Sequence, residues 1–271
     1  GAEGIRILHL EDPDGLALPA WSPGAHVDLI AGEFSRKYSL CGTPSDPRYT
    51  IAVLREEEGR GGSRFIHDKV TKGMMLRLRG PKNYFRLEEE ADRHVLIAGG
   101  IGITPIIAMA DRLKQAGRDY TVHYCGRSRR AMAFAERLLA EHGARAVLHV
   151  SDEGSRADLA GIVAECAGTG ARIHACGPAR LLDTLGELCA HLPEGTLRSE
   201  LFVSEASGAA QPGDVAFDVE LEDSDLSLTV AAGQTLLDVV RAAGIDVPSD
   251  CEEGLCGSCE VRVLEGEVDH R

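Results

Sequence analysis

Residues 95–106 read Val95-Leu96-Ile97-Ala98-Gly99-Gly100-Ile101-Gly102-Ile103-Thr104-Pro105-Ile106. The first four are apolar, which predicts a buried strand, and the glycines after them predict a tight turn. Thr104 suits the N-cap of a helix and Pro105 its first position, so we expect a helix whose free N–H groups face an anion. Gly100 and Gly102 would let a pyrophosphate approach the backbone, although tight packing between strand and helix also selects glycine.

The same order of strand, turn and helix recurs along the chain, which predicts a parallel sheet with helices on both faces. The further pairs are Thr121–Cys125 with Met132–Leu139, Val147–Val150 with Leu159–Glu165, and Ile173–Cys176 with Leu181–Cys189. The last pair encloses a second glycine turn, Cys176-Gly177-Pro178, and two such turns at the carboxyl ends of parallel strands make a dinucleotide crevice. Arg127 and Ser128 follow the second strand, where the ribose would be read, and the arginine could attract a 2′-phosphate or simply lie at a solvated helix start.

The segments on either side differ in pattern. Residues 1–88 alternate short β-type runs with Gly/Pro turns, typical of an antiparallel barrel or sandwich. After the strand and helix repeats, a Ser/Gly/Ala-rich stretch predicts a linker, followed by a hairpin at 215–221 and 226–230, a helix at 236–243 and a strand at 260–264. We therefore expect a β-barrel domain at 1–90, a nucleotide-binding α/β domain at 91–203, a linker at 204–213 and a small α+β domain at 214–271.

The charge is concentrated in that last domain. The chain has a net charge of -14, and residues 214–271 hold 15 acidic and 3 basic residues. Such a surface would repel nucleic acid. Its two candidate roles are docking to a partner with a basic surface and keeping the small domain soluble. No apolar run is long enough to span a bilayer, and no basic and apolar leader opens the sequence, so we expect a cytoplasmic protein without membrane contact. We also expect a monomer.

Three of the eight cysteines, Cys251, Cys256 and Cys259, form C-x4-C-x2-C. Thiolates suit iron–sulfur clusters, and this is the plant-type [2Fe–2S] spacing, completed by a more distant fourth cysteine. The alternatives to a cluster are that the three thiols have no shared role or that they belong to a zinc knuckle. No cysteine occurs among the 12 residues after Cys259, so we expect a ferredoxin-type domain whose end, with the fourth ligand, is not in this sequence.

Two motifs in the first domain suit a ligand that combines a flat ring with a phosphate. Arg36-Lys37-Tyr38-Ser39 on a strand would present a cation and an aromatic ring on one face and a hydroxyl on the other. Gly59-Arg60-Gly61-Gly62-Ser63 precedes a helix-like segment and offers a site for a single phosphate. Residues 1–88 show no adenine platform beside this phosphate site. By contrast, the run Glu88-Glu89-Glu90 is interpreted as a solvated linker.

Taken together, the order R-x-Y-S, G-R-G-G-S, G-G-I-G-I-T-P, C-G-P and C-x4-C-x2-C resembles the phthalate dioxygenase reductase family, which includes vanillate O-demethylase reductases. The resemblance covers the whole chain and implies a flavin-binding β-barrel, an NAD domain and a β-grasp ferredoxin domain. It implies that the flavin is FMN, and that Arg36 and Ser63 hold the FMN phosphate, with Arg60, Gly61 and Gly62 around it. The single phosphate site and the lack of an adenine platform also favour FMN over FAD. The ring system would meet the remaining FMN residues, which are Tyr38, Ser39, Ala52, Val53, Leu54, Thr104 and Phe202.

For the nucleotide, the resemblance implies contacts with Gly100, Gly102, Pro105, Arg127, Ser128, Cys176, Gly177 and Pro178. Ser39, Thr104 and Cys176 would lie at the reacting rings, where Cys176 positions nicotinamide; alone, Cys176 is equally a small buried hydrophobe ending a strand.

The resemblance implies an oxidoreductase that takes a hydride from NADH on FMN and passes single electrons through [2Fe–2S] to a terminal oxygenase of the Rieske type. A flavin is needed because NADH gives two electrons at once and the cluster accepts one. Two alternatives stay open: an NADH:flavin reductase without a working cluster, and a redox-sensing or metal-binding docking module. The resemblance favours NADH over NADPH, and the sequence does not identify the oxygenase or its substrate.

Overall fold

A computed structural model describes residues 2–59, 61–202, 214–248 and 259–266. The chain forms two compact units, Gly1–Glu205 and Ala206–Arg271. Because the barrel and the nucleotide-binding part belong to the same unit, the boundary predicted between residues 90 and 91 stays a prediction. The predicted linker at 204–213 lies outside the described residues.

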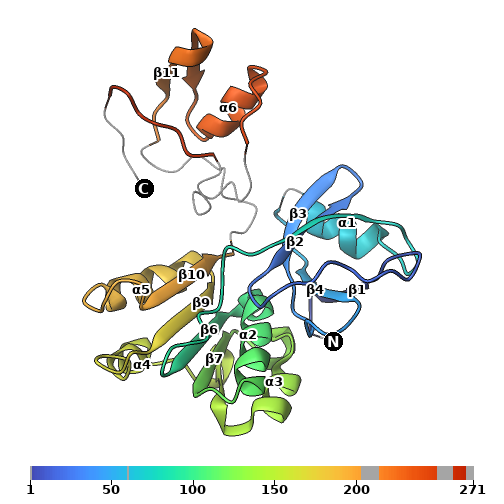
Figure 1. Cartoon of the computed structure of the whole chain (residues 1–271), viewed down its shortest axis with the longest axis vertical. Coiled ribbons are helices and arrows are strands. Elements are labelled where there is room, and N and C mark those ends of the chain that lie inside the picture. The colour runs from blue at the N-terminus through green and yellow to red at the C-terminus, as the bar shows by residue number, and fades with distance from the viewer. Residues whose placement is uncertain (1, 60, 203–213, 249–258, 267–271) are drawn as a thin grey trace. The chain divides into compact units, whose positions relative to one another are not determined.

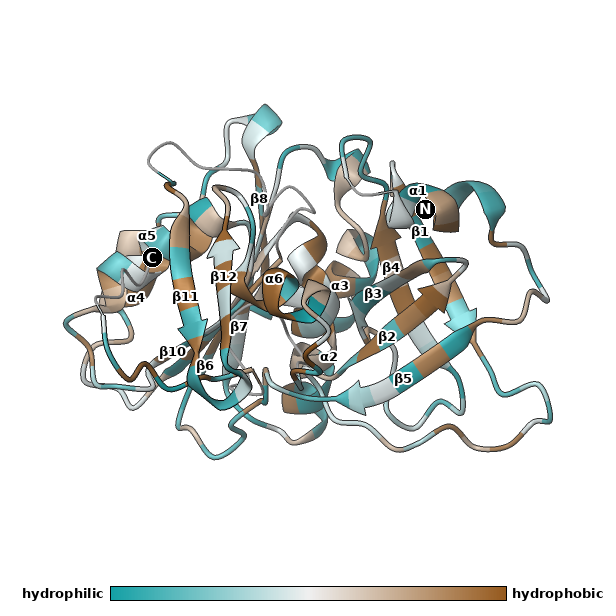
Figure 2. Ribbon diagram, turned by 90° about the horizontal axis from the view of Figure 1, so that it is seen from above, coloured by the Kyte–Doolittle hydropathy of each residue, from teal (hydrophilic) through white to brown (hydrophobic). Residues whose placement is uncertain are grey.

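The amino-terminal part of the first unit is an antiparallel barrel (Figure 1). β2 lies between β3 and β5, β1 pairs with β4, and a bridge between Leu40 and Ile51 connects the two groups. Val27, Leu29 and Ala31 alternate along β2 and face the barrel core, as the two-residue period of a strand requires. Figure 2 shows β2 and β4 as largely hydrophobic. The elements are β1 (Ile5–Leu10), β2 (His26–Ala31), β3 (Phe34–Ser39), β4 (Tyr49–Leu54), α1 (Gly62–Lys69) and β5 (Arg77–Lys82).

The rest of this unit is a five-stranded parallel sheet in the order β10-β9-β6-β7-β8. The chain runs outward from β6 through β7 to β8 and then returns to the other side of β6, so the direction of winding switches between β6 and β9. Ligands of doubly wound sheets bind at such switch points. The strands are β6 (His94–Gly99), β7 (Tyr120–Gly126), β8 (Ala146–Val150), β9 (Arg172–Gly177) and β10 (Leu197–Leu201), and the helices are α2 (Ile103–Gln115), α3 (Ala135–His142), α4 (Leu159–Ala164) and α5 (Ala179–Cys189).

Helices cover both faces of this sheet, as predicted. Leu96 and Ala98 of β6 join a core cluster with residues of α2 and α3, whereas Val95 and Ile97 join a cluster with residues of α4 and α5. The edge strand β10 was not predicted, because its sequence Leu-Arg-Ser-Glu-Leu has neither a continuous apolar run nor three apolar positions in alternation.

The second unit contains a hairpin and a short helix. β11 (Phe217–Leu221) pairs antiparallel with β12 (Leu226–Val230), and α6 (Leu236–Ala242) begins where Thr235 accepts a hydrogen bond from the Asp238 amide. The strand predicted at 260–264 is absent from this part of the structure, because a strand needs a hydrogen-bonded partner and the described residues provide none. Among the described residues, no helix is both long and apolar enough to cross a membrane.

Candidate functional site

A candidate phosphate cradle lies at the start of α1. Gly61 has φ 91°, a left-handed conformation that favours glycine, and no side chain caps the helix. The first amides of α1 are therefore available to an anion. Ser63 is buried in this first turn, and its Oγ accepts a hydrogen bond from the Glu56 amide at 3.1 Å, which leaves the hydroxyl proton for a ligand. Arg60 lies outside the described residues.

Arg36 brings a positive charge to the same place from β3. A Cβ placed on Gly62 would lie 3.1 Å from both Cγ and Nε of Arg36, so this arginine passes directly over the turn. Its guanidinium donates to the Ser35 carbonyl at 2.8 Å and lies 5.8 Å from the centre of the Phe34 ring. Helix amides, a hydroxyl and a guanidinium together fit a phosphate monoester, the group that FMN carries.

β3 and β4 carry further residues predicted for the flavin. Tyr38 pairs with Val27 and is half-buried against the barrel core, whereas Ser39 is buried opposite His26, so the two lie on opposite faces as predicted. Ala52 belongs to the core cluster that contains Ile103 and Cys176 of the nucleotide-binding part, which brings β4 to the sheet. The neighbouring residues of β4, Val53 and Leu54, are buried in the barrel core and half-buried, respectively.

The two glycine turns pack directly against each other at the switch point. A Cβ on Gly102 would lie 2.5 Å from the Cys176 carbonyl carbon and 2.8 Å from the Gly177 nitrogen. Gly102 is therefore required by packing between the turns, and the pyrophosphate role predicted for it is untested. Gly100 is different, because its φ of 56° needs glycine and the space beyond its missing Cβ is open. Of the two, Gly100 is the one whose environment suits an approaching pyrophosphate.

The helix start differs from the prediction. The 3-10 turn η1 (Gly100–Gly102) runs straight into α2, so Gly102 is the N-cap, and Thr104 and Pro105 lie inside the first turn. The prediction of Thr104 as N-cap and Pro105 as first helical residue was wrong because this extra turn starts the helix early. Thr104 is buried and donates to the Ile101 carbonyl at 3.0 Å, and Pro105 is tolerated because first-turn amides lack helical partners.

The sheet brings Phe202 to the second glycine turn. The Phe202 amide, just past the end of β10, donates to the Gly177 carbonyl at 3.2 Å. The Phe202 ring packs against the core cluster that contains Cys176, which is fully buried at the end of β9. Pro178 then precedes α5 as its N-cap residue. Residues far apart in the sequence thus meet at the carboxyl ends of β6, β9 and β10, beside the barrel strand β4.

At the end of β7 the structure adds carboxylates that sequence reasoning missed. Arg127 has an 88% exposed side chain with Nε 3.8 Å from Asp152, while Arg129 donates to Glu153 at 2.8 Å. Ser128 precedes the short turn of Arg129–Ala131. The acidic pair Asp152 and Glu153, which begins two residues after β8, is the signal that could have predicted these contacts, because the ends of adjacent parallel strands meet.

The predicted cluster ligands Cys251 and Cys256 lie outside the described residues, and Cys259, the third, has a partly exposed side chain. The scattered cysteines all lie in the first unit, where Cys41, Cys166, Cys176 and Cys189 are buried. Asp111, Glu141 and His142 could in principle hold a metal ion. However, Arg137 already pairs with both carboxylates, and His142 Nδ1 lies 2.7 Å from the Tyr120 hydroxyl, so this group is a satisfied structural network.

Comparison with known proteins covers both units. A family profile described as 2Fe-2S iron-sulfur cluster binding domain matches residues 219–271. Phenoxybenzoate dioxygenase subunit beta of Ectopseudomonas oleovorans is 41% identical over 274 residues, covering 100% of this chain and 84% of that protein. The structure of phthalate dioxygenase reductase, described as modular for electron transfer from pyridine nucleotides to [2Fe–2S], matches with a TM-score of 0.76 and 33% identity over 100% of this chain and 85% of its own. This likeness confirms the predicted fold class of barrel, parallel-sheet domain and ferredoxin domain.

A second solved structure extends the comparison to a fused protein. An intact type IV self-sufficient cytochrome P450 monooxygenase matches with a TM-score of 0.80 and 50% identity over 100% of this chain and 35% of its own. The present chain therefore spans about a third of that protein's length.

Proposed function

The chain belongs to the phthalate dioxygenase reductase family, and from this premise we propose that it oxidises NADH and delivers single electrons to an oxygenase. It is accordingly an NADH-dependent iron–sulfur flavoprotein oxidoreductase whose cofactors are FMN and [2Fe–2S]. When bound, the flavin converts a two-electron hydride donor into a source of single electrons, which the cluster passes on. The protein itself supplies binding, orientation and exclusion of water.

Each group of residues has a proposed task. Arg36 and the first turn of α1 hold the FMN phosphate, and the half-buried Tyr38 and the buried Ser39 support the ring system from β3. Gly100 admits the nucleotide pyrophosphate, while Cys176 and the Gly177-Pro178 turn position nicotinamide. The other residues predicted for the flavin and the nucleotide keep their proposed roles, and Cys251, Cys256 and Cys259 are the proposed cluster ligands.

One observation carries this proposal most strongly. Ala52 of the barrel, Ile103 after the first glycine turn and Cys176 before the second belong to one buried cluster, and Phe202 packs on it. A flavin held by the barrel and a nicotinamide held by the turns would therefore meet at the same place. Hydride transfer needs such contact, because the reacting atoms must come within about 3–3.5 Å.

Absorption spectroscopy with total iron and sulfide tests the proposal on the purified protein. Flavin bands with iron–sulfur absorbance, both bleached by NADH, are the expected result. Flavin bands alone would favour the NADH:flavin reductase, and neither chromophore would favour a docking module without catalysis.

We propose NADH as the preferred nucleotide. Glu153 already pairs with Arg129, and Asp152 lies near Arg127, so a 2′-phosphate would meet carboxylates as well as guanidinium groups. Turnover measured with NADH and NADPH at equal concentrations tests this, and a clear preference for NADPH would refute it.

The electron acceptor has two candidates. The likeness to phthalate dioxygenase reductase favours a Rieske-type oxygenase as the acceptor. The 50% identity to the self-sufficient cytochrome P450 favours a haem monooxygenase domain as the second candidate. Mixing the NADH-reduced protein anaerobically with each oxygenase would distinguish them, because haem reduction under carbon monoxide is visible in the absorption spectrum.

A cytoplasmic location and a monomeric state also stay predictions.

A further inference from the structure

A strap of ten residues, 83–92, connects the barrel to the parallel sheet and is bonded at both ends. At the barrel end, the Asn83 side-chain amide donates to Ser22 Oγ at 2.8 Å and to the Pro23 carbonyl at 2.9 Å. Gly24 lies so close that a Cβ there would be 2.8 Å from the Phe85 carbonyl carbon. The strap therefore follows the barrel loop without a gap for a side chain.

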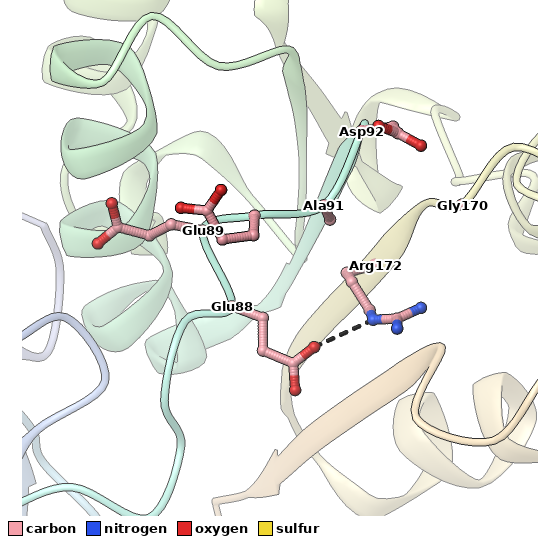
Figure 3. A pocket seen from close by; sticks show the side chains of 7 residues that line it. Glu88, Glu89, Ala91, Asp92, Gly170 and Arg172 are labelled. Carbon is pink, nitrogen blue, oxygen red and sulfur yellow. Dashed lines mark hydrogen bonds and ion pairs between the residues drawn. The ribbon is translucent and has the colours of Figure 1, made fainter.

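At the sheet end, one carboxylate contacts two strands. Glu88 accepts a hydrogen bond from Arg172 Nε at 3.0 Å and a second, short one from Arg198 (Figure 3 shows the first). Arg172 is the first residue of β9, and Arg198 is the second residue of β10. Burial alone would raise the pKa of Glu88, but the two arginines hold it below its usual value, so the carboxylate is charged at neutral pH.

Neighbouring residues of the strap add further bonds. Glu89 pairs with Arg112 of α2 at 2.8 Å, which contradicts the interpretation of the glutamate run as a solvated linker. The buried His174 of β9 has Nε2 3.3 Å from the Arg86 carbonyl, and its ring centre lies 5.8 Å from that of Phe85. The run became a contact surface because the amino ends of the parallel strands, rich in arginine, lie beneath it.

β9 and β10 carry the proposed reaction site at their opposite ends. β9 ends at Cys176 and Gly177, and Phe202 follows β10. β9 is hydrogen-bonded to β10 and to β6 over its length, so a shift at the amino ends of these strands is expected to reach their carboxyl ends. The contacts of Glu88 therefore link the barrel that would hold flavin to the strands that would hold nicotinamide.

We propose that Glu88 is a positioning residue for hydride transfer, which sets the barrel against β9 and β10 through Arg172 and Arg198. This inference rests on the proposed NADH:flavin reaction. The ion pairs are partly exposed, and pairs of that kind change stability little. Their effect on rate is larger, because a displacement of about 1 Å at a reacting pair can cost about a hundredfold.

The test compares Glu88→Gln with the matched control Glu90→Gln in the FMN-loaded full chain. Glu90 is 91% exposed and pairs with Arg118, in the loop after α2, at 3.0 Å. Anaerobic stopped-flow mixing with NADH, and with NADH deuterated at the transferred position, gives the limiting rate of flavin reduction, the apparent Kd for NADH and the isotope effect. We expect Glu88→Gln to lower the limiting rate about tenfold or more, with a full isotope effect and less than about a twofold change in Kd.

Glu90→Gln should behave as the wild type. Arg198→Gln removes the arginine of β10 that contacts Glu88 and should lower the limiting rate as Glu88→Gln does. This second variant keeps the inference testable if Glu88→Gln folds poorly. Equal limiting rates for Glu88→Gln, Glu90→Gln and the wild type would overturn the positioning role. A wild type whose flavin NADH does not reduce at all would instead refute the proposed function.

Discussion

Replacing Gly102 by alanine tests the contact between the two glycine turns directly. The new Cβ would lie 2.5 Å from the Cys176 carbonyl carbon and 2.8 Å from the Gly177 nitrogen, whereas ordinary contacts begin at 3.4 Å. Both neighbours are backbone atoms that cannot rotate away. The turns must therefore separate by roughly 1 Å, which should cost about 1–3 kcal/mol of stability and, in the proposed reaction, about a hundredfold in the rate of flavin reduction.

Gly100→Ala is the matched control, because its Cβ would enter open space. Its φ of 56° makes alanine unfavourable by about 1–2 kcal/mol, so its stability loss should resemble that of Gly102→Ala. The methyl group would instead stand where the pyrophosphate is proposed to bind, raising the apparent Kd for NADH. Thermal melting and anaerobic stopped-flow reduction give these quantities. A Gly102→Ala protein that melts and reacts like the wild type would refute the packing argument.

Three other predictions concern separate parts of the chain. Gly62→Ala would place a Cβ 3.1 Å from Arg36 Nε, and because that side chain can move, the protein should stay folded while its FMN affinity falls about tenfold, as measured by flavin fluorescence; unchanged affinity would contradict the cradle. Burial lowers the pKa of His174 from its ordinary 6.5 to about 4, so the unfolded chain binds more protons between these values and stability should fall by about 3 kcal/mol as pH drops from 6.5 to 4. Urea unfolding of His174→Gln over that range should show a smaller fall, and an equal fall would exclude this histidine as the cause. Finally, the acidic residues 214–271 suit a basic acceptor surface, so added salt should slow electron delivery to the oxygenase and leave flavin reduction by NADH nearly unchanged; stopped-flow rates that stay flat with salt would assign the acidic surface to solubility.

Local sequence was sufficient for much of the fold. Apolar runs followed by glycine turns and amphipathic segments identify the strands and helices of the parallel sheet, because a buried strand and a half-buried helix each impose their own period. Glycine with a positive φ at Gly61 and Gly100 is also a local requirement, and the turns were recognised from it. The family resemblance rested on these same motifs and on the cysteine spacing.

What local sequence could not decide is which segments meet. The strand order places the turns after β6 and β9 side by side, and only that contact shows that Gly102 serves packing while Gly100 faces open space. Glu88 illustrates the same limit. A run of three glutamates predicts a solvated segment, whereas the folded sheet brings Arg172 of β9 and Arg198 of β10 into contact with Glu88. The sequence by itself determined the elements, the turns and the cysteine motif, because these depend on near neighbours. The tertiary structure decided the partners, because contacts between residues about a hundred positions apart, such as Glu88 and Arg198, exist only once the sheet has formed.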